Sequence, residues 1–256
     1  MKAVITDLDR TLLHTDKSVS DDTVKVLKSC REKGILLVAA TARPERAITQ
    51  YQEKIGFDVL ITLNGARTVF HSKELNYSIP KKSVLQMLQK LEDIEGVIVS
   101  LETEDGIFSN VDIPQWQPTV FEKLSEAPLP DVFYKIIVSS NELDLHEYMD
   151  QILTDDTYAS VADGVLFQIM SKQATKWNGI RAALDSLGIS PEEAVFFGDD
   201  NDDIESLKNC GIGAAVSNAI KSAKEAADII IKSNDEDGVA EFLKKKLLRI
   251  KNGILR

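Results

Sequence analysis

The sequence is poor in the residues that build thiol-based metal sites and membrane helices. Its 256 residues include two cysteines and three histidines, all far apart along the chain, which argues against a disulfide framework and against a cysteine–histidine metal site. No window contains the roughly 18 consecutive apolar residues that a membrane helix needs, and the stretch MKAVITDLD has no apolar signal region. We therefore expect reduced thiols at Cys30 and Cys210, a cytoplasmic location and no membrane partner.

Positive charge is scarce as well. Thirty lysine and arginine residues against 41 aspartate and glutamate residues give a formal net charge of −11, so most of the surface should repel a polyanion such as nucleic acid. Hydrophobic residues make up 43% and charged residues 28% of the chain, which is typical of a globular protein. The length indicates about one to two domains, and no feature of the sequence indicates the oligomeric state.

Short apolar runs alternate with amphipathic segments at both ends of the chain. In the first part, the runs KAVIT, ILLVAAT and VLITLNG are separated by two segments of helical periodicity, 20–34 and 43–56. The alternation returns from about residue 172, where helix-like segments separate the runs AVFF, IGAAV and IIIK. Nearly continuous Val, Ile and Leu runs with helices between them predict an α/β fold whose doubly wound parallel sheet is buried on both faces.

The middle of the chain has a different pattern. After Pro80, a helix-like segment precedes the two extended runs of VIVSLETEDGIFSN, whose Glu-Asp-Gly centre predicts a hairpin turn. A second pair of runs, YASVADGVLFQIMS, has its predicted turn at Asp163-Gly164. We therefore predict a domain inserted within a domain: an α/β core formed by 1–79 and 172–256, and an α+β insertion formed by 80–171.

Polar residues stand at the ends of the predicted core strands. In a doubly wound sheet, ligands bind outside the carboxyl ends of the strands, near the point where the strand order reverses. Four predicted strands end in such residues: Asp7 and Asp9, Thr41 and Arg43, Asn64, and the acidic group Gly198 to Asp203. We expect these four strand ends to meet at one crevice.

The chemistry of these residues indicates a phosphoryl-transfer site. Carboxylates from separate strands, Asp7 with Asp199 or Asp203, form an all-oxygen site of the kind that Mg²⁺ occupies together with phosphate. Beside a metal, one carboxylate can attack phosphorus, and a second carboxylate two residues away can act as acid and base. Thr41 and Lys176 are available to hold the phosphoryl oxygens; Lys172, one helical turn earlier, is the alternative to Lys176.

Four segments together resemble a known family. DLDRTLL, AATAR, Lys176 ahead of a helix, and FFGDDNDDIESL resemble, in order and spacing, the four motifs of the haloacid dehalogenase superfamily of phosphotransferases. LNGA and the C-terminal stretch that begins GIGAAVSN resemble its Cof-type, sugar-phosphatase-like branch. The resemblance covers the predicted core, while the insertion resembles that branch's cap by position, size and αβ character.

The resemblance implies a role for each site residue. Asp7 is the implied nucleophile and a Mg²⁺ ligand, and Asp9 is the implied acid and base whose backbone carbonyl also binds the metal. Asp199 is a direct ligand, while Asp203 acts through water or by orienting Lys176. The implied phosphate-binding residues are Thr41, Ala42, Lys176 and Asn218.

The chain departs from the family pattern at three positions. Arg10 and Ala42 stand where glycine is usual, and Asp202 stands where asparagine is usual. Arg10 and Ala42 place bulk where backbone approaches the phosphate, so these departures concern the shape of the substrate. Asp200 and Asp202 add negative charge beside the metal site, which affects cation preference.

The function that follows is that of a Mg²⁺-dependent phosphatase acting on small phosphorylated metabolites through an aspartyl-phosphate, with the insertion as a cap. Two alternatives stay open. A phosphomutase would return the phosphoryl group to a bound sugar, and a non-catalytic regulator would bind phosphate without turnover. The sequence contains no readable code for the physiological substrate.

Overall fold

A computed structural model describes residues 1–71, 73–162 and 166–251. The chain forms two compact units, one of Met1–Leu75 with Thr175–Arg256 and one of Asn76–Ala174. These bounds lie within a few residues of the predicted division, whereas the role of the second unit as a cap stays a prediction. The turn predicted at Asp163-Gly164 lies outside the described residues.

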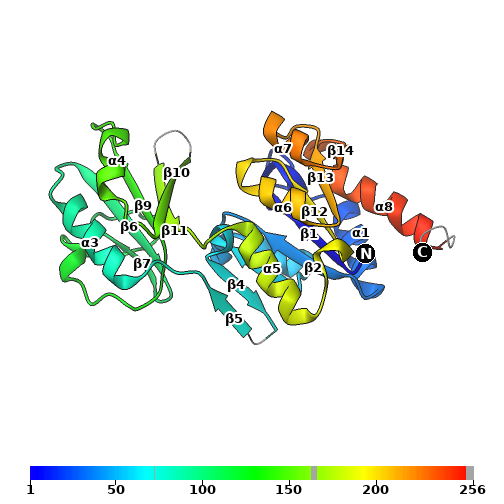
Figure 1. The fold of residues 1–256 in the computed structure, drawn as a ribbon, viewed down its shortest axis with the longest axis horizontal. Helices are drawn as coiled ribbons and strands as arrows, with labels where there is room; N and C mark the ends of the chain where they lie inside the picture. Colours follow the sequence, from blue (N-terminus) through cyan, green and yellow to red (C-terminus); the bar gives the residue numbers. More distant parts are fainter. Residues whose placement is uncertain (72, 163–165, 252–256) are drawn as a thin grey trace. The chain divides into compact units, whose positions relative to one another are not determined.

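The first unit contains an eight-stranded sheet in the order β14-β13-β12-β1-β2-β3-β4-β5 (Figure 1). Its strands are β1 (Ala3–Thr6), β2 (Leu36–Ala40), β3 (Val59–Thr62), β4 (Arg67–Phe70), β5 (Lys73–Asn76), β12 (Ala194–Gly198), β13 (Ile212–Val216) and β14 (Ile229–Ile231). All neighbouring pairs from β14 to β3 are parallel, and β4 is antiparallel to β3. The predicted α/β fold with a doubly wound sheet is confirmed, and β4 and β5 extend that sheet at one edge.

The six parallel strands have the order of a dinucleotide-binding-type sheet. Numbered along the chain, β1, β2, β3, β12, β13 and β14 lie in the order 3-2-1-4-5-6. The strand order therefore reverses between β1 and β12. Ligands of such sheets bind outside the carboxyl ends of the strands at this reversal, which makes the ends of β1 and β12 the place to look for a site.

Two groups of helices enclose the sheet. The first group is α1 (Asp21–Glu32), α2 (Thr49–Ile55) and α8 (Gly238–Lys251); the second is α5 (Lys176–Leu187), α6 (Ile204–Asn209) and α7 (Lys221–Ala226). Helix α1 packs against α2 and α8, and α6 packs against α5 and α7. All residues of β1 are buried, as expected for a strand covered on both faces.

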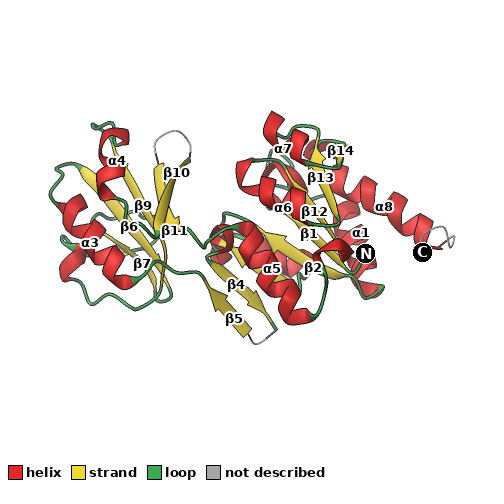
Figure 2. Cartoon of the chain, in the orientation of Figure 1, coloured by secondary structure: helices red, strands yellow, loops and turns green. Residues whose placement is uncertain are grey.

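The second unit is a mostly antiparallel sheet covered by helices (Figure 2). Its strands are β6 (Val97–Thr103), β7 (Gly106–Ser109), β8 (Thr119–Val120), β9 (Phe133–Ser140), β10 (Thr157–Ala162) and β11 (Leu166–Ser171), and its helices are α3 (Lys81–Glu92) and α4 (His146–Ile152). The order is β10-β11-β9-β6-β7-β8, with β8 parallel to β7. The hairpin predicted around Glu-Asp-Gly is confirmed by the β6–β7 pairing.

Helices α3 and α4 contribute apolar residues such as Val84, Leu88 and Met149 to the core of the second unit. Among the described residues, every helix is too short or too polar to reach across a bilayer.

Candidate active site

Asp7 and Asp199 lie side by side at the point where the strand order reverses. Asp7 follows β1 and Asp199 follows β12, and the register pairs Thr6 with Phe197. The backbone N–H of Asp7 donates to the Phe197 carbonyl at 2.9 Å, so the pairing continues to the first carboxylate. Both side chains are nearly buried, with 5% of Asp7 and 3% of Asp199 exposed.

Asp203 lies beneath the end of β12 and binds the loop that carries Asp199. Its Oδ2 accepts hydrogen bonds from the backbone N–H groups of Asp199 at 2.8 Å and Asp200 at 3.1 Å. Glycine is required at position 198, because a Cβ there would lie 2.6 Å from the Asp203 Cγ atom. The sequence FFGDDNDD thus folds so that one carboxylate supports the backbone of another.

Lys176 connects Asp7, which follows β1, with Asp203, which follows β12. It is the first residue of α5, whose N-cap Thr175 accepts a hydrogen bond from the Asn178 N–H at 3.1 Å. Its Nζ atom donates to Asp7 Oδ1 at 2.9 Å and to Asp203 Oδ1 at 2.7 Å, and it lies 3.2 Å from Asp202 Oδ2.

Lys172, the alternative to Lys176, belongs to the other unit. Its ammonium group donates to the backbone carbonyl of Asp155 at 2.8 Å. Of the two lysines, Lys176 is therefore the one that the structure brings to Asp7.

The cluster carries more negative than positive charge. Burial raises the pKa of Asp7 well above its usual range, against the opposing effect of Lys176, and burial raises the pKa of Asp199 to about 6. Burial alone would lower the pKa of Lys176, but Asp203 and Asp7 outweigh it and raise that pKa. One ammonium does not compensate these carboxylates, and a divalent cation would.

The donor set fits a hard cation. Carboxylate oxygens of Asp7, Asp199 and Asp203 lie within 4.8 Å of one another, and oxygen ligands are those that Mg²⁺ prefers. Both oxygens of Asp203 already accept hydrogen bonds. Within the described residues, no group donates to Asp7 Oδ2, and Asp199 Oδ1 accepts one bond, from Thr11 at 2.9 Å. Asp7 and Asp199 are therefore the carboxylates with oxygens available to a metal.

The Asp9 side chain turns away from this cluster and binds two cations. Arg43 donates from Nε and Nη2 to its two oxygens, both at 2.6 Å, and Lys17 donates to Oδ1 at 2.7 Å. Burial favours a higher pKa, but these hydrogen bonds outweigh it and lower the pKa of Asp9 to about 2. Asp9 is therefore ionised at neutral pH in this arrangement. Lys17 was not singled out from the sequence, and its only signal there is its place shortly after DLDRT.

Thr41 and Asn64 lie at the ends of β2 and β3. Thr41 is buried, its Oγ1 accepts a hydrogen bond from the Arg43 N–H at 3.2 Å, and its carbonyl accepts one from the Asn64 N–H at 3.0 Å. Ala42 lies between Thr41 and Arg43 in the same loop. Gly65 follows with φ 90°, and a Cβ there would lie 2.1 Å from the Thr175 carbonyl oxygen. This close approach packs the β3 loop against the residue that caps α5, next to Lys176.

Asn218 binds the loop that follows β1. Its Nδ2 donates to the Arg10 carbonyl at 2.8 Å, and its Oδ1 accepts a hydrogen bond from the Asn234 N–H at 3.0 Å. Both ends of its amide thus bind backbone. The contact with phosphate or substrate expected from the resemblance stays a prediction.

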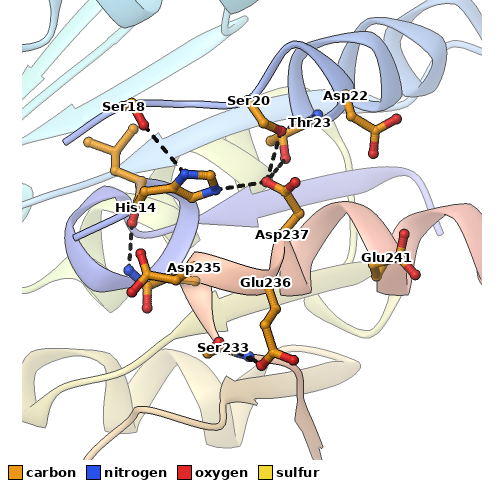
Figure 3. Close-up of polar contacts among 12 residues, drawn as sticks. His14, Ser18, Ser20, Asp22, Thr23, Ser233, Asp235, Glu236, Asp237 and Glu241 are labelled. Atoms are coloured by element: carbon orange, nitrogen blue, oxygen red, sulfur yellow. Dashed lines mark hydrogen bonds and ion pairs between the residues drawn. The ribbon is translucent and has the colours of Figure 1, made fainter. Parts of the chain in front are cut away.

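The same loop is anchored further along by the residues before α8 (Figure 3). Asp237 Oδ1 accepts hydrogen bonds from His14 Nε2 at 3.0 Å, Ser20 Oγ at 2.8 Å and Thr23 Oγ1 at 2.9 Å. Asp235 accepts two from Thr15, at 2.8 and 2.7 Å. These contacts hold the loop that carries the candidate nucleophile, and no motif in the sequence indicated them.

The chain is similar to known proteins over most of its length. The family model described as haloacid dehalogenase-like hydrolase matches residues 4–243. The chain is 25% identical to the 5-amino-6-(5-phospho-D-ribitylamino)uracil phosphatase YitU of Bacillus subtilis, over 93% of this chain and 95% of that protein. A haloacid dehalogenase-like hydrolase from Bacteroides thetaiotaomicron has a similar structure, with a TM-score of 0.85 and 21% identity over 96% of this chain and 99% of that one. The subclass IIB sugar phosphatase BT4131 aligns with a TM-score of 0.78 and 23% identity over 100% of both chains.

Proposed function

The chain belongs to the haloacid dehalogenase-like hydrolases, and from this membership we propose that it is a Mg²⁺-dependent phosphatase of small phosphorylated metabolites that works through an aspartyl-phosphate on Asp7. The observation that supports this most directly is the bridge from Lys176 to Asp7 and Asp203, beside Asp199. Relatives described as phosphatases support the reaction class.

In this proposal Asp7 is the nucleophile. One carboxylate oxygen of Asp7 forms a bond to phosphorus, while the bond from phosphorus to the ester oxygen breaks and its electron pair stays on that oxygen. The other carboxylate oxygen of Asp7 is the metal ligand, so Lys176 has to give up its bond to Oδ1 when substrate and metal bind. Mg²⁺, held by Asp7, Asp199 and the backbone carbonyl of Asp9, would supply electrostatic stabilisation of the phosphoryl oxygens. Lys176 and Thr41 donate hydrogen bonds to the same oxygens as charge develops on them.

Asp9 handles the protons of both half-reactions. In the second step it takes a proton from the water that attacks the aspartyl-phosphate, and its ionised state in this structure suits that task. In the first step it gives a proton to the leaving oxygen, which requires a protonated carboxyl. To do so, Asp9 has to exchange its hydrogen bonds with Arg43 and Lys17 for contact with the substrate.

A turnover assay on p-nitrophenyl phosphate tests the proposal. We expect release of phosphate with Mg²⁺, none with a chelator, and background activity for Asp7→Asn, whose amide keeps the side-chain shape but cannot form the phosphoenzyme. Asp150→Asn, at an exposed position of α4, is the matched control and should keep full activity. Full activity in chelator or in Asp7→Asn would overturn the proposal.

The same assay separates the alternatives. A regulator would bind phosphate without turnover, and a phosphomutase would transfer the phosphoryl group to an added sugar phosphate faster than to water. The Cof-type, sugar-phosphatase-like relationship favours hydrolysis. Small phosphorylated metabolites in the cytoplasm are the substrates that we expect.

A further inference from the structure

Arg10 lies beside Asp199 of the candidate site. It follows Asp9 in the loop after β1, and the two side chains point to opposite sides: Asp9 binds Arg43, after β2, while the Nη2 group of Arg10 donates to the Asn218 carbonyl, after β13, at 3.3 Å. Its Nε atom lies 3.7 Å from Asp199 Oδ2, and 54% of the side chain is exposed. A partly exposed guanidinium group therefore lies next to a carboxylate available to the metal.

Asn218 holds Arg10 through both its backbone and its side chain. Asn218 Nδ2 donates to the Arg10 carbonyl at 2.8 Å, in return for the bond that Asn218 accepts from the guanidinium. Asn218 is itself held by the Asn234 N–H at 3.0 Å. Although its side chain is partly exposed, Arg10 thus belongs to a loop that hydrogen bonds from Asn218 hold in place.

Arg10 has a backbone conformation that disfavours its residue type. Its φ of 57° is in the left-handed region, where glycine is comfortable and residues with a branched or long side chain are strained. Strain that persists at a site is a reason to look for a function of the side chain. Glycine at this position would relieve the strain but would lack the guanidinium group, so the guanidinium is the candidate for that function.

The guanidinium has donors left over. Of its five N–H groups, the contacts within the described residues use one for Asn218, and the 3.7 Å approach to Asp199 is longer than a hydrogen bond. Asp199 Oδ1 is already engaged by Thr11. Arg10 can therefore bind a further planar or tetrahedral anion, for which its fork geometry is suited.

We propose that Arg10 selects phosphate monoesters that carry a second anionic group, a carboxylate or another phosphate, near the ester. This inference rests on the proposed phosphatase function. In the proposed function, Thr41 after β2 and Lys176 of α5 hold the transferred phosphoryl group. Arg10 instead contacts Asn218 after β13, on the other side of Asp7 in the strand order. It therefore meets a part of the substrate beyond the phosphoryl group.

Matched substrates test the inference. Glycerol 3-phosphate and 3-phosphoglycerate differ only in a hydroxymethyl group against a carboxylate, and fructose 1-phosphate and fructose 1,6-bisphosphate differ by a second phosphate. We expect kcat/KM to favour the more anionic member of at least one pair by about tenfold or more, the size expected of a hydrogen bond to a charged group. The pair that responds identifies the second anion as carboxylate or phosphate.

Arg10→Gly should remove this preference, mainly by raising KM for the anionic member, because the contact is the same in the ground state and the transition state. It should lower kcat/KM for the less anionic member much less than for the anionic one, and it should not lower stability, because glycine adopts this φ without strain. Arg10→Lys should keep part of the preference. Arg31→Gln is the matched control, since Arg31 is 53% exposed and pairs with Asp58; it should change neither value.

Two outcomes would overturn the inference alone: equal kcat/KM within both pairs for the wild type, or an equal loss for both members in Arg10→Gly. The second outcome would mean that Arg10 binds the transferred phosphoryl group or only neutralises Asp199. If the wild type hydrolyses neither these substrates nor p-nitrophenyl phosphate with Mg²⁺, the proposed function fails, and this inference fails with it.

Discussion

Replacing Lys176 with methionine would remove the cation that now lies between three carboxylates. The ammonium group is 2.9 Å from Asp7 Oδ1, 2.7 Å from Asp203 Oδ1 and 3.2 Å from Asp202 Oδ2. The Lys176 side chain is 3% exposed, so water cannot replace it without rearrangement. Breaking a buried ion pair by removing one partner typically costs about 3–5 kcal/mol, and we expect a loss of this size at neutral pH and above.

The loss should depend on pH in a fixed direction. Burial already raises the pKa of Asp7, and raises that of Asp199 to about 6; without the ammonium, both should rise further. A carboxyl whose pKa is higher in the folded than in the unfolded chain destabilises the fold above its folded pKa. That penalty disappears as the pH falls toward its unfolded value near 4. Lys176→Met should therefore be most destabilised near pH 8 and regain part of the loss near pH 5.

Urea unfolding followed by tryptophan fluorescence measures this. The chain has two tryptophans, so a Trp116→Phe background leaves Trp177, which is 9% exposed and next to Lys176, as the reporter of the first unit. Lys221→Met is the control: its side chain is 90% exposed and 3.6 Å from Glu225, so removing it should have no measurable effect. A loss below about 1 kcal/mol near pH 8, or an equal loss at both pH values, would refute the reasoning.

Three further predictions concern single residues of the site. Asp199→Asn should lower Mg²⁺-dependent kcat by at least about 10²-fold, as expected for one preorganised electrostatic contact, and a normal rate would exclude Asp199 as a metal ligand. Gly198→Ala should destabilise the protein by about 1–3 kcal/mol, measured by urea unfolding, because the new Cβ would lie 2.6 Å from Asp203 Cγ; unchanged stability would contradict this packing. Asp9→Asn should slow hydrolysis of alkyl phosphates by about 10²–10⁴-fold. With p-nitrophenyl phosphate it should accumulate a phosphoenzyme about 80 Da heavier, and mass spectrometry that finds this group outside the peptide containing Asp7 would refute the assigned nucleophile.

The parallel strands of the core could be predicted because their sequences are almost entirely apolar, which indicates that both faces are buried. AVIT, LLVAA and AVFFG are apolar runs without a polar face, as strands covered on both sides must be. Strand β5 has the sequence KELN, and its residues are mostly exposed. An edge strand of this kind has no apolar pattern to detect, so the β4–β5 extension could not be read from the sequence.

The candidate site also has features that the sequence predicts and features that it does not. The carboxyl ends of neighbouring parallel strands lie at the same edge of the sheet. The proximity of Asp7 and Asp199 therefore follows from the sheet topology alone. The hydrogen bonds of individual side chains depend on loop conformations that no periodicity encodes. Lys17, which donates to Asp9, has a backbone φ of 68°. The side-chain amide of Asn218 binds the backbones of Arg10 and Asn234. Such pairings follow from loop geometry, which the sequence pattern does not specify.

The reversal of strand order between β1 and β12 also constrains how the protein is made. Lys176 and Asp7 are 169 residues apart in the chain, and Thr11 and Asp199 are 188 apart, so these contacts have a high contact order and close late. During synthesis, Asp7 emerges long before its partners, while the second unit is completed with its local hairpins before β12 exists. A nascent chain that ends before residue 194 would hold Asp7 on a strand with one unpaired edge, and an unpaired strand edge favours aggregation.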